Sequence, residues 1–491
     1  MYYPSKEKFI ELSDKGNVIP VYSEIMADFD TPLSAFLKID ESDFSYLLES
    51  VEGGENLGRY SFLGSNPSLV IKSRGNKIKI VRDGKTEEYS TETDPVEEVK
   101  ELMKQFKFVG TESLPRFCGG LVGYMGYDMV RFMENIPDNN PDEFVMPDMH
   151  MVLTDTILIF DHVDHKIKVV SNAIVEGSPE EAYKTACSKV DRIIEKLKAD
   201  IKKPEAGSSA NTPGEVKSNF SEKDFCESVE KVKEYIRAGD IIQLVLSQRF
   251  KKHTEADAFS IYRELRSINP SPYMYYLKFG DYKIIGSSPE ILVRCEDGVA
   301  EVRPIAGTRP RGKTEEKDKE LEKELLADPK ERAEHIMLVD LGRNDIGRVC
   351  DYASVETKEV MHIEKYSHVM HIVSNVTGKL RKDKDIYDLI RATFPAGTVT
   401  GAPKVRAMEL IDELENSRRG PYAGCVGYVS FSGNIDMCIT IRTIVMREKN
   451  AYIQAGAGIV LDSDPKNEYK ETVNKAKAMM KAIEAAEKGI E

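Results

Sequence analysis

The sequence contains no tryptophan, and its seven cysteines include no CxxC pair. Thiolate zinc sites need closely spaced cysteines and disulfide frameworks need dense, even sets, so neither is expected here. No hydrophobic run reaches the about 18–20 residues that span a membrane. The N-terminal segment also lacks the apolar core of a signal peptide. These absences predict a cytoplasmic protein with reduced thiols and no membrane partner.

An excess of positive charge is also missing, because 69 Lys and Arg residues face 83 Asp and Glu residues, a net charge of −14. Binding nucleic acid without sequence preference requires a basic face, and a polybasic membrane anchor requires clustered Lys and Arg. Neither kind of partner is therefore expected. The chain has 491 residues, 41% of them hydrophobic, which is enough for a large core. Its length predicts about two to four domains.

One segment divides the chain. Residues 200–219 are rich in Pro, Gly, Ser and charged side chains without hydrophobic periodicity, which is typical of an exposed linker or a surface loop. The sequence thus predicts an N-terminal region, 1–199, and a C-terminal region, 220–491.

Strands and helices cluster along the chain instead of alternating, which favours an antiparallel α+β fold over a Rossmann fold. Helical periodicity occurs at 180–199, 220–238 and 465–486. Strands are predicted at 68–81, 119–127, 151–171, 241–250, 273–279, 284–295 and 368–376, with a hairpin over 425–447.

Residues 307–314 (GTRPRGKT) match the phosphate-binding pattern GxxxxGK[ST], but their context does not. A P-loop follows a buried apolar strand, whereas Glu301, Arg303 and Pro304 interrupt the strand expected here. Pro310 also removes a backbone N–H that would face the phosphate. Nucleotide hydrolysis is therefore not expected.

Two predicted helices begin with the same acidic arrangement. Asp328 suits the N-cap of the first, in which Glu331 and Glu334 share a face. Glu468 and Glu471 share a face one turn inside the C-terminal helix. Two such faces across a cleft would supply oxygen ligands for Mg²⁺. Acidic first turns also cap helices and complement the helix dipole, so both interpretations fit the sequence.

Two predicted strands carry polar side chains. His371 shares a face with Val369 and Val373, where a buried histidine is either a satisfied core residue or a functional one. Arg442 falls on one face of the predicted strand 436–445. A buried guanidinium needs an anion, which would be a substrate carboxylate or a protein carboxylate.

Two further segments are candidate binding loops. Residues 455–459 (AGAGI) follow a predicted strand, and their glycines would either bring backbone N–H groups close to a ligand or form a tight turn. Residues 393–404 are typical of a rigid loop feeding a helix at Val405, and their hydroxyl groups would bind a ligand or cap that helix.

Four segments, in this order, resemble the signatures of the chorismate-utilising enzymes, and among them the large subunits of anthranilate synthase. They are 304–310 (PIAGTRP), 338–345 (LVDLGRND), 397–404 (GTVTGAPK) and 456–462 (GAGIVLD). The resemblance extends from about Phe29 to the C-terminus. It implies large antiparallel sheets packed as a sandwich with helices outside, and an N-terminal regulatory part intertwined with the catalytic part. It also implies that chorismate and ammonia give anthranilate and pyruvate.

The resemblance further implies a set of site residues. Those implied to hold Mg²⁺ are Glu334 and Glu471, with Glu331 and Glu468 beside them. Those implied to bind the substrate are Tyr422, Arg442, Gly456, Gly458 and Lys475. Those implied to act as acid and base, or to contact the substrate during the reaction, are Glu290, His371 and Thr398.

Two positions distinguish among relatives. Isochorismate and salicylate synthases carry a lysine that activates water where this chain has Gln243, and without that base ammonia is the favoured nucleophile. Aminodeoxychorismate synthases typically carry a lysine where this chain has Ala306. Both positions favour anthranilate. The alternatives are an aminodeoxychorismate or isochorismate synthase, or a ligand-binding subunit of the same fold without catalysis.

The resemblance also implies partners. No cysteine lies in a GxCxG elbow, so ammonia would come from a separate glutamine amidotransferase subunit. The segments 47–50, 58–64 and 269–276 resemble a feedback site for L-tryptophan. The residues implied to form that inhibitor site are Ser50, Pro272, Tyr273 and Met274. Otherwise, residues 47–50 are a strand end followed by a glycine-rich turn.

Overall fold

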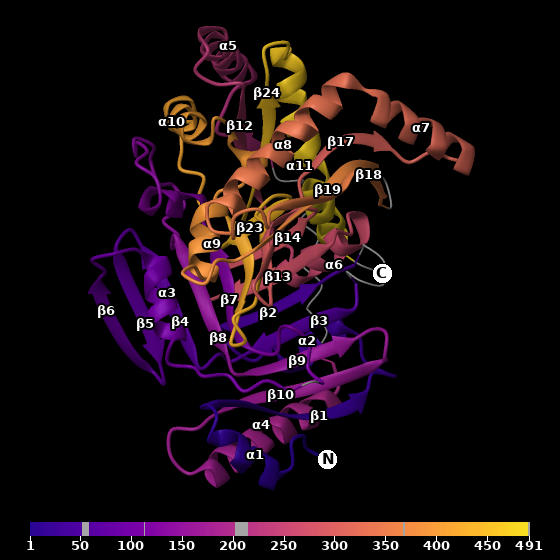
Figure 1. The fold of residues 1–491 in the computed structure, drawn as a ribbon. Helices are drawn as coiled ribbons and strands as arrows, with labels where there is room; N and C mark the ends of the chain where they lie inside the picture. Colours follow the sequence, from indigo (N-terminus) through magenta and orange to yellow (C-terminus); the bar gives the residue numbers. More distant parts are fainter. Residues whose placement is uncertain (52–57, 112, 202–214, 367–368, 490–491) are drawn as a thin grey trace.

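The structure, a computed structural model, describes residues 1–51, 58–111, 113–201, 215–366 and 369–489. Two large antiparallel sheets form a sandwich with helices on its outer faces, as the α+β prediction and the resemblance imply (Figure 1). Most of the predicted linker, residues 202–214, and His368 of the predicted strand 368–376 lie outside the described residues.

The first sheet, called sheet I, joins strands from both parts of the sequence. Its order is β1 (Val18–Met26), β10 (Lys166–Ile174), β9 (Thr156–Asp161), β3 (Tyr60–Ser65), β2 (Phe44–Glu49), β13 (Tyr273–Phe279), β14 (Tyr282–Ser288), β23 (Thr443–Arg447), β24 (Asn450–Ile459), β12 (Gln243–His253) and β11 (Val216–Ser218). The short β20 (Gly401–Ala402) also pairs with β12.

The second sheet, called sheet II, also joins strands from both parts of the sequence. Its order is β17 (Ile305–Pro310), β19 (Val369–Lys379), β16 (Val299–Val302), β15 (Ile291–Glu296), β22 (Ile435–Ile439), β21 (Cys425–Ser430), β7 (Gly120–Met125), β8 (Met149–Thr154), β4 (Leu69–Arg74), β5 (Lys77–Arg82) and β6 (Lys85–Ser90). In addition, β18 (Glu356–Lys365) pairs with β19. In each sheet the N-terminal strands form one half and the C-terminal strands the other, and the halves are joined by the pairs β2–β13 and β7–β21. Both sheets therefore run through both parts of the chain, which makes the two parts one intertwined fold.

The helices cover the outer faces of the two sheets (Figure 1). Those packed on sheet I or on one another beside it include α1 (Lys6–Ser13), α2 (Pro32–Ile39), α4 (Pro179–Lys198), α5 (Glu222–Ala238), α6 (Ala258–Ile268), α10 (Lys404–Leu414) and α11 (Pro465–Lys488). Those on the side of sheet II are α3 (Pro95–Met103), α7 (Glu315–Ala327), α8 (Pro329–Gly347) and α9 (Ile386–Thr393). Two 3₁₀ turns, η1 (Tyr127–Phe132) and η2 (Gly397–Val399), complete the described elements. None of the described helices has the length and apolar character to cross a membrane.

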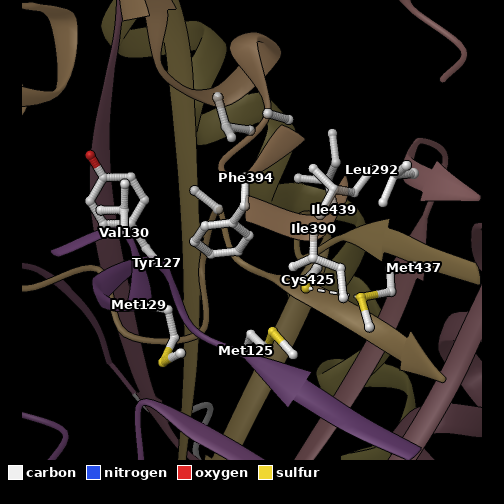
Figure 2. Close-up of a cluster of buried hydrophobic side chains, with 14 of the residues drawn as sticks. Met125, Tyr127, Met129, Val130, Leu292, Ile390, Phe394, Cys425, Met437 and Ile439 are labelled. Carbon is white, nitrogen blue, oxygen red and sulfur yellow. Dashed lines mark hydrogen bonds between the residues drawn. The ribbon is translucent and has the colours of Figure 1, made fainter. Parts of the chain in front are cut away.

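The hydrophobic core has a layer between the sheets and a layer on each outer face. Aromatic residues from both sheets, among them Tyr46, Tyr124, Tyr275 and Tyr428, fill the space between them. On the outer face of sheet II, Leu292 and Ile439 pack near Ile390 and Phe394 at the end of α9 (Figure 2). This tight packing fixes the strand ends that carry the polar residues described below.

The prediction of a hairpin over 425–447 is correct for the turn at 432–434 and the two strands beside it. It is wrong for residues 440–447, which do not continue the second strand. β21 and β22 pair as expected, but the chain leaves sheet II after Ile439 and enters sheet I at Thr443. Arg442 in this crossing has a φ of +51°, a left-handed conformation uncommon for a residue with a side chain. Alternation predicts which face a side chain takes, but not that a strand passes from one sheet to the other.

Residues 455–459 also differ from their prediction. They do not follow a strand but form the last half of β24 itself, paired with β12. The helix ends were predicted more accurately: α5 ends at Gly239, whose φ of +84° matches the left-handed C-cap that glycine favours.

Candidate functional site

One cavity of about 530 Å³ lies where α8 and α11 face the ends of β12, β19 and β24. All thirteen residues that the sequence predicts as catalytic, substrate-binding or metal-binding line it. They are Gln243, Glu290, Glu331, Glu334, His371, Thr398, Tyr422, Arg442, Gly456, Gly458, Glu468, Glu471 and Lys475. These residues come from sequence positions more than 200 apart and meet only through the sheet topology.

Along one edge of β24, the backbone N–H groups of Gly456 and Gly458 have no partner strand among the described residues. Val245 and Ser247 of β12 lie opposite Gly458 and Gly456, yet their N–H groups donate to Thr400 and Glu415 instead of β24. These are therefore non-hydrogen-bonded pairs, and the N–H groups of both glycines point away from β12. The next strand, β23, pairs with β24 only up to Ile453. The glycine N–H groups thus face the cavity.

A larger side chain would be crowded at both positions, more severely at Gly456. A Cβ atom at Gly456 would lie 2.7 Å from the Tyr422 hydroxyl oxygen, and one at Gly458 would lie 2.8 Å from the Gln243 amide nitrogen. The two side chains therefore rest directly against the glycine backbone. Tyr422 and Gln243 close the cavity beside the free edge of β24.

Arg442 is a cation without a partner carboxylate. Its Nη1 donates to the carbonyl oxygen of Lys475 at 3.2 Å. Within the described ranges, no Asp or Glu oxygen lies within 4.0 Å of its guanidinium. The protein salt bridge that the sequence left open is therefore not formed. A desolvated guanidinium in a cavity favours an anionic ligand, and its planar fork suits a carboxylate.

Glu290 is a buried carboxyl group that accepts a hydrogen bond from the Thr398 hydroxyl at 2.7 Å. Burial raises its pKa to about 8, although the Thr398 hydrogen bond and the charge of Lys475 act in the opposite direction. At neutral pH the group is therefore mainly protonated, and it can donate a proton to a leaving group.

His371 has the complementary character. Its Nδ1 lies 2.9 Å from the carbonyl oxygen of Gly307, which can only accept, so Nδ1 carries the proton. Burial lowers the pKa of the ring below its usual value, which keeps it neutral. Nε2 then holds the lone pair and can accept a proton.

Four glutamates line the cavity from the first two turns of α8 and α11. Burial, and then the neighbouring charges of Glu331 and Glu471, raise the pKa of Glu334. Burial also raises the pKa of Glu468, with Glu471 adding to the effect. These carboxylates are close enough to repel one another, which is the condition that a bound cation relieves.

Two of these glutamates also form ion pairs within the protein. Glu331 accepts from Arg309 at 3.2 Å, and Glu471 pairs with Lys475 at 2.7 Å. As the sequence predicts, Asp328 caps α8 through its side chain, which accepts from the backbone N–H groups of Lys330 and Glu331. In the part of the chain that the structure describes, no three His, Cys, Asp or Glu side chains converge closely enough to form a metal cage. The arrangement instead suits Mg²⁺, which takes few carboxylates and keeps several waters.

A second cavity, of about 570 Å³, lies between the sheets and is lined by all four residues predicted for the inhibitor site. They are Ser50, Pro272, Tyr273 and Met274. Asp436 lies at the same cavity and accepts hydrogen bonds from Tyr273, Arg116 and Arg294. The glycine-rich turn predicted after Ser50 falls on residues 52–57, which are outside the described residues.

The apparent P-loop is part of a β-strand and its following turn. Residues 305–310 form β17, and the N–H of Gly312 donates to the carboxylate of Asp318, which Arg311 also binds. The anion that this segment holds is thus a side chain of the protein, in agreement with the exclusion of nucleotide hydrolysis.

Sequence reasoning missed one buried ion pair directly behind the cavity, Glu415 with Arg419. The four-residue spacing of these residues is visible in the sequence, but on helices it is common on exposed faces and carries no information on burial.

The chain is similar over nearly its whole length to known proteins. The model of the chorismate binding enzymes matches residues 44–481. The curated protein "Anthranilate synthase component 1" of Acetivibrio thermocellus is 52% identical over 492 residues, covering 99% of each chain. Its counterpart of the same name in Aquifex aeolicus (strain VF5) is 53% identical over 495 residues, again covering 99% of each.

Solved structures show the same relation. Anthranilate synthase component I from Streptococcus pneumoniae TIGR4 superposes with a TM-score of 0.77 at 38% identity, covering 93% of this chain and 99% of that chain. MenF, the menaquinone-specific isochorismate synthase from Escherichia coli, shares the fold with a TM-score of 0.71 at 18% identity, covering 98% and 99%.

Proposed function

The chain belongs to the family of chorismate binding enzymes, and from that premise we propose that it converts chorismate and ammonia into anthranilate, pyruvate and water. Its full-length similarity to proteins named anthranilate synthase component 1 supports this choice. The structural observation that carries it is the unpaired Arg442 beside the free N–H groups of Gly456 and Gly458. Chorismate has two carboxylates, and this wall offers the cation and backbone donors that one of them needs.

The chemistry assigns distinct tasks to the acid and the base. Nitrogen bonds to ring carbon 2 while the 4-hydroxyl leaves, taking a proton from Glu290 to depart as water. The ring then loses the proton at carbon 2 as pyruvate is eliminated, and His371 assists this step through its free Nε2. Thr398 holds the Glu290 carboxyl in place by its hydrogen bond. Tyr422 and Arg442 hold the pyruvyl carboxylate.

Gln243 supports amination over hydration. A neutral amide cannot deprotonate water, whereas ammonia is already a nucleophile. The buried Gln243 lies against Gly458 at the cavity wall, where a lysine would be needed to activate water. The similarity to isochorismate synthases, at less than a fifth of positions, extends to the fold alone.

Mg²⁺ is part of the proposal. Glu334 and Glu471 would hold it, with Glu331 and Glu468 beside them, since their mutual repulsion fits a cation between the two helices. Bound there, Mg²⁺ supplies Lewis-acid polarisation of the ring carboxylate. Lys475 contributes a second positive charge on this side while donating to the Gly456 carbonyl oxygen at 2.9 Å.

Two partners follow from the same proposal. The relatives named component 1 imply a second component, which we take to be a glutamine amidotransferase that supplies ammonia. The cavity between the sheets would bind L-tryptophan as an inhibitor. Ser50 would bind the polar end of the amino acid, and Pro272, Tyr273 and Met274 would form the opposite wall of the cavity.

Anthranilate fluorescence tests the proposal. Purified chain, chorismate, Mg²⁺ and ammonium should produce a signal that EDTA abolishes and that L-tryptophan lowers, and the background is low because the chain contains no Trp. A Ser50→Leu variant should keep the rate and lose the inhibition. Consumption of chorismate without anthranilate would contradict the proposed reaction.

A further inference from the structure

Arg419 and Glu415 form an ion pair whose side chains are only 1% and 3% exposed. Arg419 Nε donates to Glu415 Oε2 at 2.9 Å and Nη2 donates to Oε1 at 2.6 Å, so the pair is bidentate. Glu415 follows the last residue of α10, and Arg419 lies in the loop before β21. Neither residue lines the cavity. Any effect of the pair on the reaction must therefore pass through other residues.

The remaining N–H groups of Arg419 bind two walls of the cavity at once. Nη1 donates to the carbonyl oxygen of Val399 at 2.7 Å, and Nη2 donates to that of Val245 at 2.8 Å. Val399 follows Thr398, whose hydroxyl group binds Glu290. Val245 lies opposite Gly458. One guanidinium thus ties the turn that carries Thr398 to the strand that supports the glycine edge.

Glu415 and a stacked ring extend this network. Glu415 Oε1 accepts from the backbone N–H and the hydroxyl of Ser247 at 2.9 and 2.7 Å, and Ser247 lies opposite Gly456. The Arg419 guanidinium carbon also lies 5.5 Å from the ring centroid of Tyr422. The ion pair is therefore connected to three separate groups that face the substrate.

We propose that Arg419, held by Glu415, is a positioning residue that sets the relative places of Thr398, Tyr422 and the glycine edge of β24. This inference rests on the proposed function. A planar fork with five N–H donors can reach two carbonyl oxygens and a carboxylate together, whereas the single ammonium group of a lysine cannot. Displacements of about 1 Å in such a wall are enough to change rates by about 100-fold.

The Arg419→Lys variant tests this role, because it keeps the charge and removes the fork. We expect kcat/KM for chorismate to fall by about 100-fold. The Kd for chorismate, measured by calorimetry without ammonium, should rise by about 10-fold, while the KM for ammonium stays within about 2-fold.

A second readout is the pH profile of kcat for the Arg419→Lys variant. The Thr398 hydrogen bond lowers the Glu290 pKa, so its loss should move the alkaline limb of kcat to higher pH.

The Glu415→Gln variant serves where Arg419→Lys does not fold, since its amide oxygen still accepts from Ser247. Its matched control is Glu487→Gln, which removes the carboxylate partner of another buried cation, Lys252. Lys252 Nζ lies 2.8 Å from Glu487 Oε2, and neither residue lines the cavity. Both variants should lose stability, but only Glu415→Gln should change the chorismate Kd and the pH profile.

Folded variants at position 415 or 419 that bind chorismate and titrate like Glu487→Gln would overturn the positioning role. Absence of anthranilate formation by the unsubstituted chain would instead overturn the proposed function, so the two failures are distinguishable.

Discussion

Glu290 shows at the scale of one residue how burial prepares a carboxyl group for acid catalysis. Its pKa is raised from 4.5 to about 8 by burial, and no cation forms an ion pair with it among the described residues. The rate that depends on its proton should therefore hold at neutral pH and decline as the pH rises through about 8. A kcat profile that stays flat well above this pH would contradict the assignment.

The raised pKa of Glu290 also makes the free energy of unfolding fall as the pH rises. The folded chain keeps the Glu290 proton between about 4.5 and about 8, whereas the unfolded chain loses it, so this group lowers the free energy of unfolding as the pH rises through that window. A Glu290→Gln variant lacks this effect. In denaturant titrations its stability relative to the unsubstituted chain should increase by a few kcal/mol across the window. Parallel pH profiles for the two proteins would exclude a buried, protonated Glu290.

The residue scale also marks a limit of sequence reasoning. The identity of Arg442 and its need for an anion could be predicted, since a buried guanidinium is costly without one. Its lack of a protein carboxylate could not, because that depends on every side chain packed around the crossing between the sheets. The Arg419–Glu415 pair was missed for the same reason: its spacing is visible in the sequence, but its burial is a tertiary property.

At the scale of elements, α8 and α11 each present an acidic first turn to the same cavity. Both N-caps and both pairs of glutamates were predictable from local rules, because capping and helical spacing involve only neighbouring residues. That the two helices face each other was implied only by the resemblance. The sequence predicts a binding loop for the last half of β24 because glycines are uncommon in strands, whereas in the structure Gly456 and Gly458 lie within the strand, against Tyr422 and Gln243.

The facing helices lead to a prediction in which stability and activity change in opposite directions. Glu334→Gln removes one of several carboxylates that repel one another, so in EDTA the thermal midpoint should hold or rise slightly. Anthranilate formation with Mg²⁺ should fall by about 100-fold or more, because an amide is a poor ligand for a hard cation. Glu484→Gln, an exposed position on α11, is the control and should change neither property. Near-normal turnover by Glu334→Gln would contradict the metal assignment.

At the scale of the whole molecule, the site forms where C-terminal strands of both sheets meet α8 and α11, while the N-terminal strands extend each sheet on its other side. The α+β class and most element positions followed from periodicity and clustering. The order of the strands did not, because hydrophobic pattern does not specify which strand pairs with which across 200 residues. The crossing from β22 to β23 is the clearest case: it connects a strand lining the cavity between the sheets to Arg442 in the cavity beside α8 and α11.

The most direct test of the proposed reaction follows the nitrogen atom. The purified chain would be incubated with chorismate, Mg²⁺ and ¹⁵N-labelled ammonium, and the products separated and identified by mass spectrometry. The account predicts anthranilate carrying ¹⁵N, with one pyruvate formed per anthranilate. Formation of isochorismate, or of an aminated product that retains its pyruvyl group, would contradict it.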